Sequence, residues 1–434
     1  MKNTFIVSCP IDTYSGYGAR ARDFVRSLVE LNKYDVKILS QRWGNTSQGF
    51  IKKNKKEWGF LEKLVIPGLQ EKPDYWCQIT VPNEFQNVGK YNIGLTAGIE
   101  TTACDIEWIN GCNRMDLILT SSEHSKSTFI NSQYQHSKNQ EDIVKLIKPI
   151  EVLFEGGNLD VYKIIKKFEN KELYNQINSI PEDFAYLNVG HWMQGNYGHD
   201  RKNIGFTLKS FYETFKNQEN QPALILKTSK VNSSIGDRET IMRKISDIRD
   251  SIDGENLPSV YLLHGEFSDK EMNELYNHPK VKAMVSHTKG EGFGRPLLEF
   301  SLIDKPLIAS GWSGHLDFLH KDYTGLCGGK LNTIDKSAQV KGILIEGSQW
   351  FDVDHNYVNH FYNEMVNEYD MWLKKSKKQG KHSRENFNYN KMTDKIKDLL
   401  DTYLPELPKK MELKLPGVNK IKMPKKNNKL KIVK

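Results

Sequence analysis

The sequence predicts an α/β protein of two domains, each built around a parallel sheet. Short apolar runs alternate with amphipathic stretches along the 434-residue chain, which is the pattern of repeated strand–helix units. A polar stretch rich in Lys, Asn and Glu interrupts this alternation at 163–183, and a new series begins at Phe184. A chain of this length usually folds into two or three domains. We therefore place one domain at 1–182 and a second at 183–385.

The first domain begins with a strand and an amphipathic helix. The helix is expected at Ala19–Leu31, where Phe24, Leu28 and Leu31 recur at helical spacing. The expected strands are the apolar runs Thr4–Ser8, Asp35–Leu39, Tyr75–Thr80, Ile93–Thr96, Asp116–Thr120 and Glu151–Phe154.

The second domain repeats this alternation and ends in helices. Tyr357–Leu373 is amphipathic, and Asp354 before it is a suitable N-cap. A last helix is expected at 386–404, packing back on the first domain. The expected strands are Ala185–Val189, Ala223–Lys227, Val260–His264, Lys282–Ser286 and Pro306–Ala309.

The C-terminal tail at 405–434 carries the excess charge of the chain. It contains ten lysines and two glutamates, while the whole chain has a net charge of +8, so the preceding residues are neutral overall. Prolines at 408, 416 and 424 exclude a helix and favour extended conformations. The tail is either a solubilising segment or a docking site for an anionic partner such as DNA or an anionic membrane.

The composition predicts a cytoplasmic protein. If the source is viral, the cytoplasm is that of the host cell. No apolar run approaches the roughly 18 residues of a membrane span, and the N-terminus predicts a strand rather than a signal peptide. The five cysteines form no C-x-x-C pair, so we expect reduced, buried thiols.

A glycine-rich turn at 286–300 is the strongest candidate for a binding loop. It follows an expected strand and leads into a helix that begins near Pro296. Gly290, Gly292 and Gly294 let backbone N–H groups approach a ligand closely, and the helix N-terminus favours an anion.

Two glutamates flank this turn. Glu291 lies in the loop and Glu299 lies eight residues later on the helix, so one can bind sugar hydroxyls while the other binds ribose hydroxyls. The alternative is a structural glycine turn with two incidental surface glutamates.

The order of several segments resembles retaining glycosyltransferases with the GT-B fold, particularly glycosyltransferase family 4. The similarity is dense from about 184 to 330 and looser in the first domain. It comprises the Glu-x7-Glu spacing of Glu291 and Glu299, Tyr261-Leu-Leu-His-Gly-Glu-Phe, Glu271–Tyr276, Lys305-Pro-Leu-Ile-Ala-Ser-Gly-Trp-Ser-Gly-His and Asp322-Tyr-Thr-Gly-Leu.

This resemblance implies two Rossmann-like domains that face each other across a cleft, with a nucleotide-sugar donor bound to the second domain. It places Glu291 by the donor sugar and Glu299 on the ribose. Gly292, Phe293 and Gly294 would contact the sugar and phosphate through their backbone.

The resemblance also implies cations on the donor diphosphate. The arginine that commonly follows the first donor-domain strand is replaced by His191, and Arg201 and Lys202 follow after a longer loop. We assign the lysine role to Lys202 and the arginine role to Arg201, and regard Lys227 as a further candidate. For Arg201 and Lys202 alone, a solvated surface pair is the alternative.

The first domain supplies fewer candidates. Gly16 and Gly18 resemble the glycine loop that faces the donor phosphates, although a tight structural turn explains them equally well. Glu100 stands where family members often place a functional histidine, so it either assists the acceptor hydroxyl or only caps a helix. His124 is expected at the start of a helix.

No set of residues has the spacing of a metal site. Asp352 and Asp354 form a D-x-D, the metal motif of the other glycosyltransferase fold, but they lie after the main strands of the domain. We therefore expect no metal requirement and no cofactor, since the nucleotide sugar is itself a substrate.

The function expected is retaining transfer of a sugar from a nucleoside diphosphate to an acceptor hydroxyl. A glycan, a lipid and a modified nucleic-acid base remain open as acceptors, and the oligomeric state also stays open. The alternatives are a nucleotide-sugar epimerase or hydrolase on the same fold, and a polyanion-binding protein with an inactive transferase body.

Overall fold

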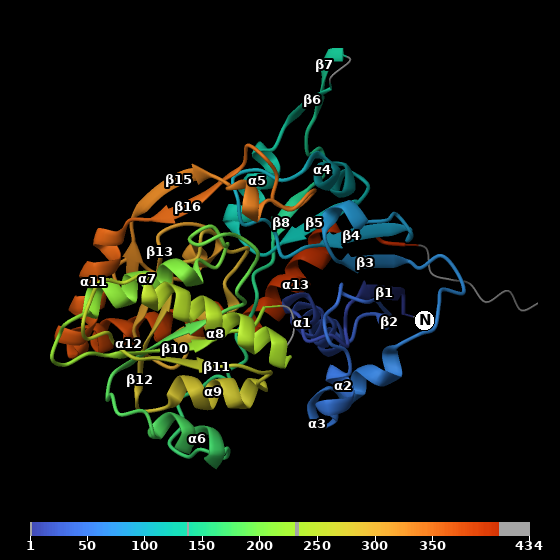
Figure 1. The fold of residues 1–434 in the computed structure, drawn as a ribbon. Coiled ribbons are helices and arrows are strands. Elements are labelled where there is room, and N and C mark those ends of the chain that lie inside the picture. Colours follow the sequence, from blue (N-terminus) through green and yellow to red (C-terminus); the bar gives the residue numbers. More distant parts are fainter. Residues whose placement is uncertain (1, 137–138, 231–233, 408–434) are drawn as a thin grey trace, which may run out of the picture.

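The computed structural model describes residues 2–136, 139–230 and 234–407. They form two α/β domains side by side, each with a six-stranded parallel sheet flanked by helices (Figure 1). The two Rossmann-like domains expected from the sequence are confirmed. The basic tail predicted at 405–434 lies outside the described residues from Pro408 onward.

The first sheet contains all six strands expected in this half of the chain. Its order is β2-β1-β3-β4-β5-β8, and every pairing is parallel. The strands are β1 (Thr4–Cys9), β2 (Asp35–Ser40), β3 (Tyr75–Ile79), β4 (Tyr91–Leu95), β5 (Leu117–Thr120) and β8 (Ile150–Val152).

The second sheet has the order β11-β10-β9-β12-β13-β14, again wholly parallel. Its first five strands were expected, and the short β14 was not. The strands are β9 (Ala185–Val189), β10 (Ala223–Lys227), β11 (Val260–Leu263), β12 (Val281–Ser286), β13 (Leu307–Ser310) and β14 (Gly325–Cys327).

Helices cover both sheets. Those in the first half are α1 (Gly16–Leu31), α2 (Phe50–Lys53), α3 (Lys55–Trp58), α4 (Ile106–Asn113) and α5 (Glu123–Asn131). Those that follow are α6 (Lys171–Asn178), α7 (Ile204–Phe215), α8 (Ile235–Asp250), α9 (Asp269–Asn277), α10 (Arg295–Ser301), α11 (His355–Asn367), α12 (Tyr369–Asn386) and α13 (Tyr389–Tyr403).

Two helices differ from the prediction. Helix α1 begins at Gly16 rather than Ala19, because the Ser15 hydroxyl accepts a hydrogen bond from the Gly18 amide at 2.9 Å and caps the extra turn. The helix expected at 357–373 is divided at Glu368, whose backbone leaves helical geometry. The expected cap is confirmed, since Asp354 accepts the Asn356 amide at 2.8 Å.

Two antiparallel hairpins were not expected from the sequence. One consists of β6 (Tyr134–His136) and β7 (Asn139–Val144), and it projects from the first domain in Figure 1. The other consists of β15 (Gly329–Thr333) and β16 (Gln349–Val353) in the second domain.

Two helices pack on the core of the other domain. Helix α6, which precedes the expected domain boundary, packs on the second domain, and α13, which follows the second domain, packs on the first. Leu173 and Ile177 of α6 join the hydrophobic core of the second domain. Met392 and Ile396 of α13 join the core of the first domain, where α13 lies against α1. Among the described helices, none is both long and apolar enough to cross a membrane.

Because α13 completes the first core, Ile396→Ala should lower the free energy of unfolding of the first domain by about 2–5 kcal/mol. Ile396 is 1% exposed, so its truncation leaves a cavity. Urea unfolding followed by circular dichroism measures the change, and the exposed neighbour Lys395→Ala is the control. A change below about 1 kcal/mol for Ile396→Ala would show that α13 is dispensable for the first domain.

Candidate functional site

The candidate site lies where the strand order of the second sheet reverses direction. The chain runs outward from β9 to β11 and then returns to β12 on the other side of β9. The loops after β9 and β12 therefore diverge at one edge and form the crevice in which such sheets bind ligands. The first loop carries Arg201 and Lys202, and the second carries Glu291.

These two loops form a largely buried cluster of charges. Lys202 Nζ lies 2.6 Å from Glu291 Oε1, and Arg201 Nη1 lies 3.4 Å from Glu291 Oε2. Arg201 Nη1 also lies 3.4 Å from Glu100 Oε1 of the first domain and donates to the Gly290 carbonyl at 2.9 Å. Four residues singled out in the sequence thus meet at one point.

The two cations keep Glu291 ionised. Burial alone would raise the pKa of this carboxyl, but the charges of Lys202 and Arg201 lower it to about 2. At neutral pH Glu291 is therefore a carboxylate rather than a neutral acid.

The glycine loop at 290–294 makes close contact with the first domain. A Cβ on Gly290 would lie 2.0 Å from the Glu100 carbonyl oxygen, and a Cβ on Gly292 would lie 2.2 Å from that of Ala97. Gly294 has φ +96°, a conformation that disfavours any residue with a side chain. These glycines are therefore required by packing as well as by any ligand.

The backbone of this loop presents unused donors. In the described chain, the amides of Gly292, Phe293 and Gly294 donate no hydrogen bond to protein. The Phe293 side chain is buried in the core against Phe318, so only its backbone can face a ligand. Three successive free N–H groups make a cradle suited to an anion.

Two residues after β13 hold this loop in place. The Ser313 hydroxyl accepts the Glu291 amide at 2.9 Å, and Ser313 adopts φ +83°, a strained value for a residue with a side chain. His315 is fully buried and lies against Gly294. Its Nε2 is 2.6 Å from the Ser310 carbonyl oxygen, so Nε2 carries the proton and donates.

Glu299 belongs to a second charged cluster, centred on Arg295. Arg295 Nε lies 2.9 Å from Glu299 Oε1, while its Nη1 lies 2.7 Å from Asp23 of α1 and 3.6 Å from Glu155. Arg295 therefore joins carboxylates of both domains. Burial raises the pKa of Glu299 to about 7, although the charge of Arg295 opposes this shift.

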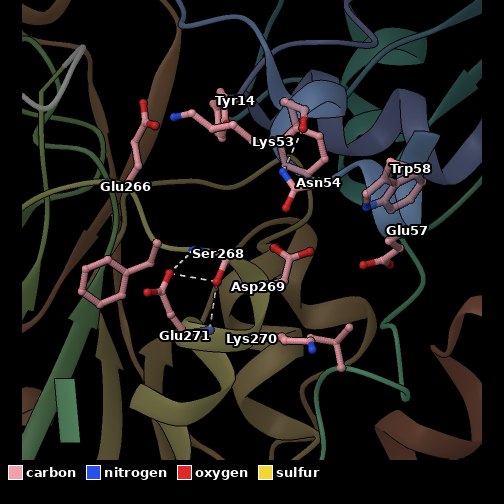
Figure 2. A pocket seen from close by; sticks show the side chains of 13 residues that line it. Tyr14, Lys53, Asn54, Glu57, Trp58, Glu266, Ser268, Asp269, Lys270 and Glu271 are labelled. Atoms are coloured by element: carbon pink, nitrogen blue, oxygen red, sulfur yellow. Dashed lines mark hydrogen bonds between the residues drawn. The ribbon is translucent and has the colours of Figure 1, made fainter. Parts of the chain in front are cut away.

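A cavity of about 420 Å³ opens between the domains (Figure 2). Tyr14, Lys53 and Trp58 line it from the first domain, and the chain from Glu266 to Glu271 lines it from the second. Asp269 lines this cavity, and its negative charge contributes to the raised pKa of Glu299.

The other predicted residues lie around these clusters. Gly16 and Gly18 form the first turn of α1, and Tyr17 between them lies 2.9 Å from Thr96 Oγ1, beside the loop that meets Gly292. Lys227 donates to the Gly265 carbonyl at 2.6 Å and lies over the Phe267 ring, which forms part of the cavity wall. It therefore lies against the cavity wall, and in the described chain no hydrogen bond or ion pair joins it to Glu291. Burial lowers the pKa of Lys227 to about 8.

Three remaining candidates have structural partners. His191 Nδ1 lies 3.1 Å from Ser229 Oγ, and His124 is the second residue of α5, as expected, with its ring against Trp312. Asp352 forms an ion pair with Lys289. Among the described residues, no group of three His, Cys, Asp or Glu side chains could hold a metal ion.

The fold is that of known two-domain glycosyltransferases. Sucrose-phosphate synthase of Thermosynechococcus elongatus matches with a TM-score of 0.60 at 12% identity, over 93% of this chain and 99% of that one. A glycosyltransferase of Rickettsia africae matches with a TM-score of 0.58 at 14% identity, over 93% and 99%. HepE of Anabaena in complex with UDP and glucose matches with a TM-score of 0.55 at 12% identity, over 92% and 100%.

These similarities show the GT-B fold, which confirms the fold expected from the sequence. No family model and no curated protein matches the chain.

Sequence reasoning missed several residues that shape the site. Ser313 and His315 lie in the quoted Gly-Trp-Ser-Gly-His segment, but nothing in that segment indicated that they support the glycine loop. Arg295 lies next to the glycine turn, and its partner Asp23 is 272 residues away in sequence. That separation left no local signal for the pairing.

Gly292→Ala should force the two domains apart at the glycine loop. The added methyl group would overlap the Ala97 carbonyl, and overpacking of this kind costs about 1–3 kcal/mol. The melting temperature should fall, and the radius of gyration measured by X-ray scattering should rise. Gly16→Ala is the control, because a Cβ there meets no atom within 4 Å. Equal melting temperatures for the two variants would contradict the close contact.

Proposed function

We propose that the protein is a retaining glycosyltransferase that moves a sugar from a nucleoside diphosphate to an acceptor hydroxyl. The observation that carries this proposal is the buried cluster of Arg201, Lys202 and Glu291 at the strand-order reversal of a GT-B fold. Structures of HepE, which has the same fold, contain UDP or UDP-glucose, which supports a nucleotide-sugar donor.

The charged groups are arranged as a donor of this kind requires. Lys202, Arg201 and the free amides of 292–294 would bind the diphosphate, and Glu291 would bind the hydroxyls of the sugar. Glu299 would bind the ribose, and the cavity of about 420 Å³ between the domains has the size of a small-molecule site. Lys227, which lies over the Phe267 ring of the cavity wall, would supply a further cation.

The reaction breaks the bond between the anomeric carbon and the diphosphate oxygen and forms a bond to the acceptor oxygen on the same face. The departing oxygen carries the electron pair and accepts the proton of the incoming hydroxyl. Lys202 and Arg201 would stabilise the charge that develops on the leaving group, which is the kind of interaction that usually contributes most to such catalysis. Glu100, 3.4 Å from Arg201, would act as a positioning residue for that cation.

The remaining parts of the proposal are an acceptor that is a glycan, a lipid or a modified base, no metal or cofactor, and a cytoplasmic location. All five cysteines are buried free thiols, which supports a reducing compartment. Asp352 forms an ion pair with Lys289, and the Asp354 carboxylate caps α11. These protein partners support a reaction without a metal at the D-x-D. Docking of an anionic partner on 405–434 is proposed from the charge of that segment alone.

A donor screen that detects release of nucleoside diphosphate tests the function. We expect one nucleotide sugar to be consumed, and Lys202→Ala and Glu299→Gln each to lower kcat by about 10²–10³-fold, since each removes a contact to the donor. Lys216→Ala is the control, because Lys216 pairs with Glu213 on the surface of α7. Unchanged turnover in both site variants, with normal melting temperatures, would refute the assignment.

Product analysis in the same screen separates the alternative activities. Transfer to an added acceptor with unchanged anomeric configuration supports the proposal, whereas free sugar or an epimer indicates a hydrolase or an epimerase.

Chelation should leave turnover within about twofold of its initial value, because the D-x-D carboxylates already have protein partners. The measurement is the rate of nucleoside diphosphate release after treatment with EDTA and gel filtration. Loss of activity that manganese or magnesium restores would show that a metal is required.

A further inference from the structure

A second cavity lies in the second domain, and its lining shares no residue with the cavity between the domains. Its volume is about 540 Å³, within the range of roughly 300–1,000 Å³ found for small-molecule sites. The loop between β9 and Arg201 forms one wall, and α7 and α8 form the others. All its lining residues belong to the second domain, on the side where Figure 1 shows α7 and α8.

Two aromatic rings give this cavity a flat apolar surface. Tyr197 is 49% exposed, and its ring lies on Gly205 in the first turn of α7, where a Cβ would approach the ring to 3.2 Å. Trp192 is 4% exposed and packs in the domain core. A large aromatic ring held half-exposed on a glycine is a ready platform for stacking.

The charges around the rings are balanced. Lys209 Nζ lies 5.7 Å from the centre of the Tyr197 ring, and Lys244 Nζ lies 4.9 Å from that of Trp192. Asp247 supplies a carboxylate to the same walls, whereas the Asp200 carboxylate is 1% exposed and accepts the Ile204 amide at 3.2 Å. The cavity therefore offers donors and acceptors without a net charge.

We propose that this cavity binds an uncharged saccharide unit, with one face of the sugar ring stacked on Tyr197. The C–H face of a sugar ring is apolar and suits an aromatic surface, while its hydroxyls donate and accept and so can satisfy ammonium and carboxylate groups together. An anion would meet the Asp247 carboxylate in the same cavity, and a quaternary ammonium would have to compete with the two lysines that lie over the rings.

This site does not depend on the proposed transferase activity. Its lining includes none of Arg201, Lys202, Glu291 and Glu299, although Asp200 directly precedes Arg201 in the chain. It would hold a sugar of a glycan beside the donor domain without taking part in bond formation.

Saturation-transfer NMR on the full chain tests the proposal with maltose, lactose and chitobiose as probes. At least one disaccharide should bind, and Tyr197→Ala and Asp247→Ala should each weaken that binding tenfold or more. Gly205→Ala should weaken it less while preserving the fold, because it shifts the ring slightly and alanine favours the helix. Lys216→Ala, directly after α7 and outside the cavity, should bind as the wild type does.

Inorganic phosphate and tetramethylammonium serve as competing probes. The proposal is wrong if no disaccharide binds, if Tyr197→Ala binds as tightly as the wild type, or if one of these ions alone binds at Tyr197. Because the readout is binding in variants outside the donor site, its outcome is separate from that of the donor screen.

Discussion

Buried pairing of opposite charges across the domain interface is the constraint on which the site depends. Arg201 and Arg295 each contact carboxylates of both domains, Glu100 with Glu291 and Asp23 with Glu299. Leaving one such charge unpaired in a buried position costs several kcal/mol, so the closed arrangement holds only while every partner is in place. The glycine loop lies between the two clusters and lets the backbones of the domains touch.

This pairing also determines how an anionic ligand must enter. Lys202 is bonded to Glu291 in the closed structure, so a diphosphate reaches it only by sharing or displacing that carboxylate. Glu299 is likewise held by Arg295, and ribose hydroxyls would compete for the same oxygens. Under the proposed function, the donor would therefore compete with the protein partners of Lys202 and Glu299, whereas Arg201 and Arg295 make the pairs to the first domain.

The fold was more predictable than the site because their signals have different ranges. Buried parallel strands such as β9 and β10 are continuous apolar runs, which are visible in the local sequence. The exposed strand β15 has no such pattern, and it was missed. In the site, Lys202 and Glu291 came from resemblance to a family, whereas Asp23 and Glu155 become partners of Arg295 only through contacts between distant segments.

The way the chain crosses between the domains limits how the site can open. It passes into the second domain after β8 and returns before α13, and the two crossings lie side by side. The Gly157 amide donates to the Phe387 carbonyl at 2.8 Å, and the Tyr389 amide donates to the Gly157 carbonyl at 2.9 Å. A Cβ on Gly156 would lie 2.7 Å from the Tyr389 Cα, so the approach requires glycine. Because both crossings are tied together at one edge, the domains can separate at the ion pairs only by rotating about this paired segment.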